Sequence, residues 1–158
     1  MTSLNKITKH WTAGVYTPNN TDRQHYHYLV DDKGNIFTGK YKPEDNINCK
    51  DGKYAAHTGG GNTGNIGVAI CGMWSKDYPI RRVQLEAACK LIAELATKYN
   101  IRITNEKILT HAEFGNKFPH TTSYGKIDIN NLPCVAVYGV DNVGNWIRNK
   151  VVWYKSKL

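Results

Sequence analysis

The sequence predicts a single α/β domain in which helices flank a central mixed β-sheet. Two observations support this fold class. Segments of strand length with apolar or alternating patterns recur along the chain, and two longer segments carry apolar residues at helical spacing. Strands that alternate with helices are typical of α/β folds. A length of 158 residues is enough for one domain with a substantial core and hardly enough for two.

Four regions have the pattern of β-strands. The first is residues 6–11, and the second is a β-hairpin in which residues 25–30 and 35–39 flank an Asp-Asp-Lys-Gly turn. Residues 65–72 form a nearly continuous apolar run, which is typical of a strand covered on both faces. Residues 107–111 are the fourth candidate. We expect these segments to form the central sheet.

Two amphipathic helices follow from the spacing of apolar residues. The first lies within residues 81–100, with these residues on its apolar face: Leu85, Ala88, Leu91, Ile92, Leu95 and Tyr99. The second lies at about 141–156, with this apolar face: Val143, Trp146, Ile147, Val151 and Tyr154. Residues 41–64 and 114–124 lack periodicity and are predicted to be long loops, which in a compact domain are usually functional or disordered.

The chain carries a net charge of +8, which favours an anionic partner such as nucleic acid, anionic lipid or an acidic cell wall. The basic residues are spread out, however, so a merely solvated basic surface is an equal alternative. No recognition helix or aromatic-basic motif supports nucleic-acid binding. No apolar run has the length of a membrane span or of a signal peptide, so we expect synthesis in the cytoplasm.

Three residues have the chemistry of a catalytic zinc site. His10 and His111 each end a predicted strand, and strand ends can meet at one rim of a sheet. In the stretch YGKID, Lys126 and Asp128 are two residues apart, so in an extended segment they point into one common space. Two imidazoles and a carboxylate, with a fourth position for water, make a catalytic zinc site. The alternatives are polar strand ends and a surface ion pair of the lysine and aspartate.

Two other patterns point to different functions and are rejected. The GGGNTG stretch at 59–64 fits a dinucleotide-binding motif, but an apolar strand follows it where that motif needs a helix. The pair His111 and Glu113 with Pro-Cys at 133–134 resembles a zinc deaminase signature, but the second required cysteine is Val137. A nucleoside deaminase is therefore a poor alternative.

Five segments occur in the order and spacing of one enzyme family: ITKHWTAG, HYHYLVDDKGNIFTGK, AAHTGGGNTGNIGVAICG, ILTHAEFG and YGKID. Over about residues 5–130, the chain resembles the type 2 N-acetylmuramoyl-L-alanine amidases. These include phage endolysins and the animal peptidoglycan-recognition proteins. Each segment is weak evidence alone, and the five in order are strong evidence. The resemblance implies an α/β fold of the amidase type 2 or peptidoglycan-recognition kind.

The resemblance also implies roles for individual residues. His10, His111 and Asp128 match the ligands of one Zn²⁺ ion, although some relatives have cysteine at the third position. Tyr26 matches the tyrosine that faces the activated water in the phage enzymes, where other branches place a glutamate. Lys126 matches the lysine that stabilises the developing oxyanion. Such a site would polarise the amide carbonyl and activate water at neutral pH.

Other polar residues in these segments have alternative roles. His57 matches a histidine that lines the substrate groove in relatives, with an ordinary loop histidine as the alternative. Glu113 is a second candidate base, or else a partner that supports the site. His25 and His27 flank the candidate catalytic tyrosine and, on a strand, would face away from the site. His120 lies in the loop before YGKID, and nothing in the sequence fixes its position.

The sequence departs from the family in two places. Many relatives continue the third ligand as Asp-Pro-Gly and a helix, whereas this chain reads Asp-Ile-Asn at 128–130. The segment between His10 and Tyr26 is short, so the helix that some relatives have there is expected to be reduced or absent. The groove would then be more open.

The sequence therefore predicts one zinc amidase domain over residues 1–158, with a C-terminal helix at about 141–156. It would hydrolyse the bond between the lactyl group of N-acetylmuramic acid and the L-alanine of the stem peptide. We expect a bacteriolytic phage or prophage endolysin, monomeric, made in the host cytoplasm and acting on the cell wall in the periplasm after release. The alternative is a peptidoglycan-binding domain without catalysis, but the retained ligand residues favour catalysis.

Overall fold

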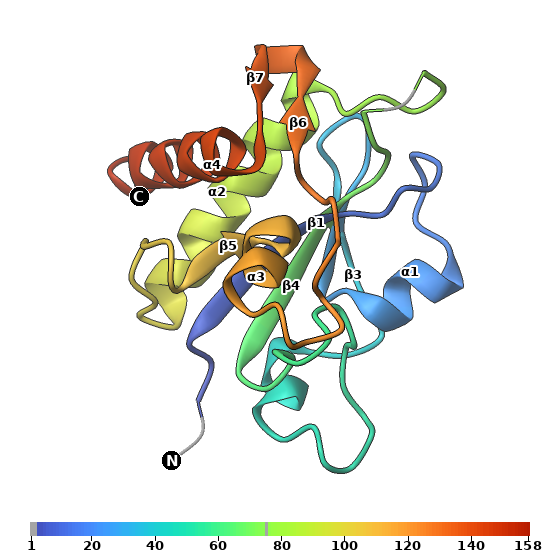
Figure 1. Ribbon diagram of the computed structural model, residues 1–158, viewed down its shortest axis with the longest axis vertical. Helices are drawn as coiled ribbons and strands as arrows, with labels where there is room; N and C mark the ends of the chain where they lie inside the picture. The colour runs from blue at the N-terminus through green and yellow to red at the C-terminus, as the bar shows by residue number, and fades with distance from the viewer. Residues whose placement is uncertain (1–2, 75) are drawn as a thin grey trace.

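A computed structural model describes residues 3–74 and 76–158. Its centre is a five-stranded mixed sheet with strand order β3-β2-β4-β1-β5, which confirms the predicted fold class (Figure 1). All neighbouring strands run parallel except the β2–β3 hairpin. The strands have these bounds: β1 Lys6–Trp11, β2 Tyr28–Val30, β3 Ile36–Thr38, β4 Asn65–Ile70 and β5 Ile108–Thr110.

Two long helices pack together on one side of the sheet, and two short ones lie nearer the strand ends (Figure 1). The long helices confirm the two amphipathic predictions. The α-helices have these bounds: α1 Asn20–His25, α2 Arg82–Lys98, α3 His111–Lys117 and α4 Val140–Lys155. The remaining elements are two 3₁₀ helices and a small hairpin: η1 Pro43–Ile47, β6 Asn131–Leu132, η2 Pro133–Val135 and β7 Val137–Tyr138.

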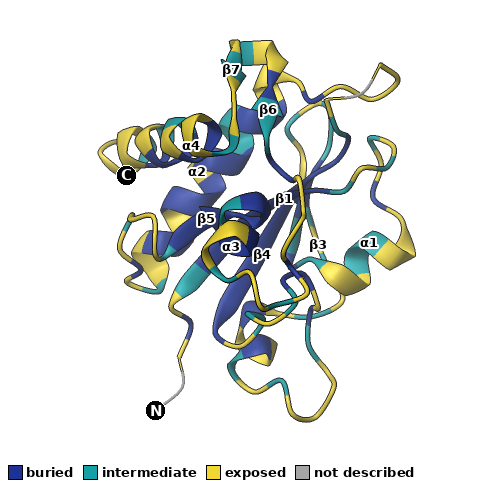
Figure 2. Ribbon diagram, viewed as in Figure 1, coloured by how far each residue is buried: buried dark blue, intermediate teal, exposed yellow. Residues whose placement is uncertain are grey.

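The core lies between the sheet and the helices α2 and α4. Every residue of β4 is buried, and so is every residue of β1 after Lys6, as the dark strands in Figure 2 show. The apolar face predicted for the first helix packs here, with Leu85, Ala88 and Ile92 fully buried. Within the described ranges, no helix is both long enough and apolar enough to cross a membrane.

Capping residues set the bounds of two short helices, of which α3 was not predicted. Residues 25–27 were assigned to a strand, but α1 ends at His25, and β2 begins only at Tyr28. The Asn19 side chain caps α1, so the helix expected to be reduced is six residues long. Likewise α3 occupies the start of the predicted loop 114–124, because Thr110 and Glu113 form a capping box.

Lys9 is an unusual member of the core. Its side chain is fully buried, and its Nζ atom has no hydrogen-bond partner among the described residues. Burial lowers the pKa of this ammonium from 10.5 to about 7, although the nearby Cys89, Cys71 and Asp128 act in the opposite direction. Removing an amine from water without a compensating partner destabilises the folded state.

The Lys9→Met variant is therefore expected to be more stable than the wild type at neutral pH, by on the order of a few kcal/mol. The pKa of Lys9 is lower in the folded state, so the unfolded chain binds more protons between about pH 7 and 10.5. The advantage of the variant should be largest near pH 7 and below, and should shrink as pH rises toward 10.5. Thermal unfolding at several pH values would measure it.

The matched control is Lys90→Met, because Lys90 lies on α2 with its side chain exposed. This control should change the melting temperature little. A Lys9→Met protein that is no more stable than the wild type at neutral pH would show that the buried amine is compensated.

Candidate active site

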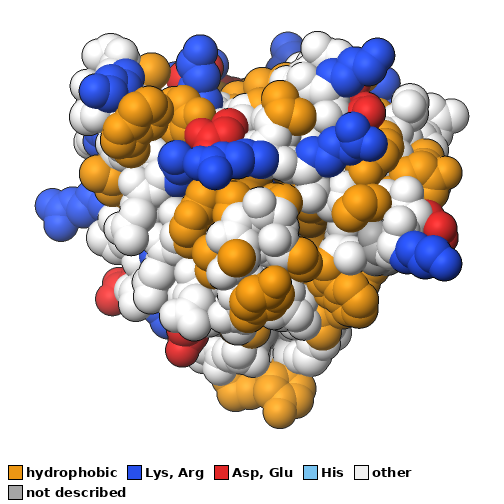
Figure 3. Space-filling model, turned by 90° about the horizontal axis from the view of Figure 1, so that it is seen from above, with side chains coloured by type: hydrophobic (Ala, Val, Ile, Leu, Met, Phe, Trp, Pro, Cys, Tyr) orange, Lys and Arg blue, Asp and Glu red, His pale blue; other side chains and the backbone are white. Residues whose placement is uncertain are grey.

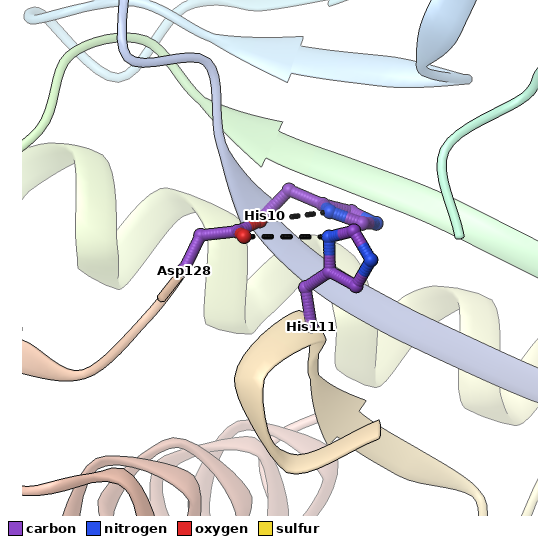
Figure 4. A group of neighbouring side chains, drawn as sticks. All are labelled: His10, His111 and Asp128. Atoms are coloured by element: carbon purple, nitrogen blue, oxygen red, sulfur yellow. Dashed lines mark hydrogen bonds and ion pairs between the residues drawn. The ribbon is translucent and has the colours of Figure 1, made fainter. Parts of the chain in front are cut away.

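His10, His111 and Asp128 converge in the fold (Figure 4). One ligand atom from each residue lies within 4.8 Å of the others, and all three residues are buried. The Nδ1 atom of His10 is 3.0 Å from one carboxylate oxygen of Asp128, and Nδ1 of His111 is 3.3 Å from the other. The structure thus brings together the three residues predicted as metal ligands.

The sheet and one loop contact produce this convergence. β1 and β5 are parallel neighbours, with Lys9 opposite Thr110, so His10 and His111 follow at the same edge. His111 does not end a strand as predicted but is the first residue of α3, directly after β5. The carbonyl oxygen of Asp128 accepts a hydrogen bond of 2.6 Å from the Ala112 N–H. This bond ties the loop that carries the carboxylate to the first turn of α3.

The electrostatics of the three residues fit a divalent cation. Burial would raise the pKa of the Asp128 carboxyl, but its contacts with the two imidazoles outweigh this effect and lower the pKa to about 2. Burial lowers the pKa of His10 to about 4, and it also lowers the pKa of His57. At neutral pH the site therefore holds an anionic carboxylate beside the neutral ring of His10. Two imidazoles and a carboxylate are one of the donor sets that bind zinc at catalytic sites.

The metal-ligand candidates lie at a cleft of about 730 Å³. Five of the six predicted site residues line it: Tyr26, His57, His111, Lys126 and Asp128. The sixth, His10, is completely buried behind them. The lining also includes His25 and Met73, which sequence analysis did not assign to the site. Lys126 and Asp128 thus share one space, as their spacing predicted.

Tyr26 lies at the C-cap of α1 rather than on a strand. Its ring centroid is 5.1 Å from that of His10. Burial, together with the charges of Asp128 and Asp22, raises the pKa of the phenol. The hydroxyl therefore keeps its proton at neutral pH, and it is suited to donating or orienting a hydrogen bond rather than to acting as a strong base.

Lys126 lies at the cleft with its side chain exposed. Its backbone N–H donates to the carbonyl oxygen of Ser123 at 3.2 Å, and the preceding Gly125 has a φ of 87°, in the region that favours glycine. In the described part of the chain, the Asp128 carboxylate contacts the two histidines and forms no ion pair with Lys126. The alternative of a simple Lys-Asp surface pair is therefore not what the structure shows.

Glu113 has a structural partner that explains its position. Both of its carboxylate oxygens accept hydrogen bonds of 2.9 Å from the Arg148 guanidinium on α4. One of them also accepts from the backbone N–H of Thr110. These contacts hold α3 against α4 and leave little capacity for a proton transfer. Glu113 is therefore a structural residue that fixes α3, on which His111 lies, and not a base that faces the cleft.

The remaining histidines separate into different environments. His27 is buried away from the ligands, with its ring nitrogens bonded to Asn46 and to the Gly67 N–H. His25 lines the cleft because it ends α1 instead of lying on a strand, and its Nδ1 donates to the Ala56 carbonyl. His120 lines a neighbouring hollow beside Phe118. The prediction that His25 faces away from the site was therefore wrong. It assumed a strand, whereas His25 is the last residue of α1.

Comparison with known proteins gives one family and several similar folds. A family model described as N-acetylmuramoyl-L-alanine amidase matches residues 2–126. Among solved structures, Staphylococcus aureus hydrolase AmiA, in complex with its ligand, is 17% identical with a TM-score of 0.65. That alignment covers 99% of this chain and 77% of AmiA.

Two further structures are similar over a shorter part of the chain. N-acetylmuramoyl-L-alanine amidase LysC from Clostridium intestinale is 20% identical with a TM-score of 0.51, covering 68% of this chain and 69% of LysC. Drosophila peptidoglycan recognition protein SD is 22% identical with a TM-score of 0.51, covering 70% of each chain. Identities this low show a shared fold. No curated protein sequence matches the chain.

Proposed function

Because this chain belongs to the N-acetylmuramoyl-L-alanine amidase family, we propose that it is a zinc-dependent amidase of peptidoglycan. It would hydrolyse the amide bond between the lactyl group of N-acetylmuramic acid and the L-alanine of the stem peptide. The observation that carries this proposal is the buried convergence of His10, His111 and Asp128 at a cleft that also contains Tyr26 and Lys126. A binding domain without catalysis would not need this set.

The proposed reaction needs a polarised carbonyl, an attacking water and stabilisation of a negative oxygen. His10, His111 and Asp128 would hold one Zn²⁺ ion, which as a Lewis acid supplies the polarisation and the activation of water. The exposed ammonium of Lys126 would donate to the carbonyl oxygen as negative charge develops on it. Tyr26, protonated at neutral pH, would orient the reacting groups through its hydroxyl.

The wall polymer, rather than a small soluble molecule, is the proposed substrate. The cleft is open to solvent along Lys126 and Ile127, both of which are exposed. Figure 3 shows Lys and Arg side chains spread over one face of the molecule, with hydrophobic side chains between them. A dispersed positive surface and a net charge of +8 would favour an anionic cell wall over a single charged ligand.

We further propose a phage or prophage endolysin that acts as a monomer on the wall in the periplasm after synthesis in the host cytoplasm. Tyr26 supports the assignment to phage enzymes. Phage enzymes of the family have tyrosine at this position, whereas other branches have glutamate. The positive surface would attract the enzyme to the anionic wall.

Digestion of purified peptidoglycan, followed by mass spectrometry of the soluble products, tests the proposed activity. The expected products are stem peptides with a free L-alanine amino terminus and glycan chains with intact N-acetylmuramic acid. Protein that binds the wall in a pull-down but releases no such peptides would instead support a recognition domain. Cleavage within the glycan or within the peptide would contradict the assigned bond.

A further inference from the structure

We propose that His57 and Ser123 are positioning residues that keep the proton of each liganding histidine on Nε2, so that both Nδ1 atoms face the zinc position. This inference rests on the proposed zinc amidase function. His10 Nε2 is 3.0 Å from His57 Nδ1, and His111 Nε2 is 3.0 Å from Ser123 Oγ. Each ligand is thereby linked to the protein backbone through one intermediate side chain.

The first branch starts at a backbone carbonyl. His57 Nε2 is 2.9 Å from the carbonyl oxygen of Asn65, which can only accept a hydrogen bond. The single proton of a neutral His57 ring is therefore on Nε2, and its Nδ1 is an acceptor. With Nδ1 of His10 directed at a bound zinc ion, the ring proton is on Nε2, which donates to that acceptor. Thr58 Oγ1 lies 2.8 Å from His57 Nδ1 and 3.3 Å from His10 Nε2, and its rotatable hydroxyl is compatible with this assignment.

The second branch also ends at a backbone carbonyl. Ser123 Oγ donates to the carbonyl oxygen of Gly59 at 2.7 Å. Because a hydroxyl has one hydrogen, Oγ has only acceptor capacity left for His111. His111 Nε2 must therefore carry a proton and donate it to Ser123. The two branches come from different loops, yet they place the proton on the same nitrogen of both ligands.

The consequence appears at Asp128. With the protons on Nε2, the Nδ1 lone pairs of His10 and His111 point at carboxylate oxygens 3.0 and 3.3 Å away. In the metal-free protein the same Nδ1 atoms hydrogen-bond to the carboxylate and lower its pKa, so the relay describes the zinc-loaded state, in which a cation would lie among these lone pairs. The relay thus explains which atom of each imidazole would bind zinc. Ligating histidines commonly donate their other ring N–H to a protein partner, which fixes both tautomer and ring orientation.

Close packing holds both positioning residues in place. A Cβ atom at Gly67, on β4, would lie 2.6 Å from Cγ of the His57 ring. A Cβ atom at Gly115, on α3, would collide with the carbonyl oxygen of Ser123. Glycine at these two positions allows the imidazole and the serine backbone to pack directly against the sheet and the helix. The two hydrogen-bond acceptors are therefore fixed before any metal binds.

Zinc affinity is the measurement that tests the relay, by competition with a chromophoric chelator. His57→Leu and Ser123→Ala should each weaken zinc binding by about 10- to 100-fold. His57→Asn should bind zinc more tightly than His57→Leu. The Asn side chain has an acceptor, Oδ1, two bonds from Cβ, which is where Nδ1 lies in histidine. The matched control is His27→Leu, which also removes a buried, doubly hydrogen-bonded histidine but has no hydrogen bond to a ligand. Its folded form should bind zinc like the wild type.

Long-range ¹H–¹⁵N spectra of the zinc-loaded wild type give a second readout that does not depend on the variants folding. His10 and His111 should each show a proton on Nε2 and none on Nδ1. An Nδ1 proton on either ligand, or unchanged zinc affinity in both variants, would overturn the relay while leaving the metal centre intact. Wild-type protein that binds no zinc would overturn the metal centre and the relay together.

Discussion

The Asp128→Ala variant is expected to lose peptidoglycan hydrolysis and to bind zinc roughly 10²–10³-fold more weakly than the wild type. Protein zinc sites release about 10–16 kcal/mol on binding, so one ligand among a few accounts for several kcal/mol. Because bound metal stabilises only the folded state, zinc should raise the melting temperature of the wild type much more than that of the variant. Zinc content, thermal unfolding with and without zinc, and the peptidoglycan digest would measure these effects.

Two controls separate loss of the ligand from general damage. A chelator should abolish the activity of the wild type, and added zinc should restore it. Asp128→Cys provides another metal-binding atom at the same position, and it should retain far more zinc than Asp128→Ala. An Asp128→Ala protein that remains zinc-replete and active would rule out the carboxylate as a ligand. Full activity of wild-type protein from which all metal has been removed would rule out the metal mechanism.

The Lys126→Ala variant is expected to lower kcat by about 10²–10³-fold, as for the loss of one oxyanion donor. KM should change little, because the contact forms mainly as negative charge develops on the carbonyl oxygen. Lys126 is exposed, so its truncation leaves no cavity, and the melting temperature and zinc content should stay near those of the wild type. Steady-state kinetics on a soluble muropeptide would provide both constants.

Exposed Lys90 on α2 offers a comparison for this variant as well. Lys90→Ala changes the net charge by the same amount, so any effect of overall charge on substrate binding should appear in both proteins. Only Lys126→Ala should lose kcat. If both variants keep wild-type kcat, Lys126 is an ordinary surface lysine without a role in catalysis.

Sequence patterns predicted the sheet and the two long helices well. The buried strand β4 has an uninterrupted apolar run, and α2 repeats apolar residues at helical spacing. Both signals depend on burial of a whole segment, so they are visible without knowledge of its neighbours. The sequence did not reveal α3, and it left α1 as a helix that is reduced or absent, because helices of six and seven residues are too short to show a periodic apolar pattern.

The sequence by itself identified the residues of the candidate site: two histidines, an aspartate, a tyrosine and a lysine in the order of one amidase family. It could not determine what each side chain contacts. Only the tertiary structure showed that Glu113 is engaged by Arg148, that His25 and not His27 reaches the cleft, and that His57 contacts His10. The reason is physical. Residue type and spacing are properties of the local chain, whereas hydrogen-bond partners far apart in sequence meet only when the sheet and its loops pack.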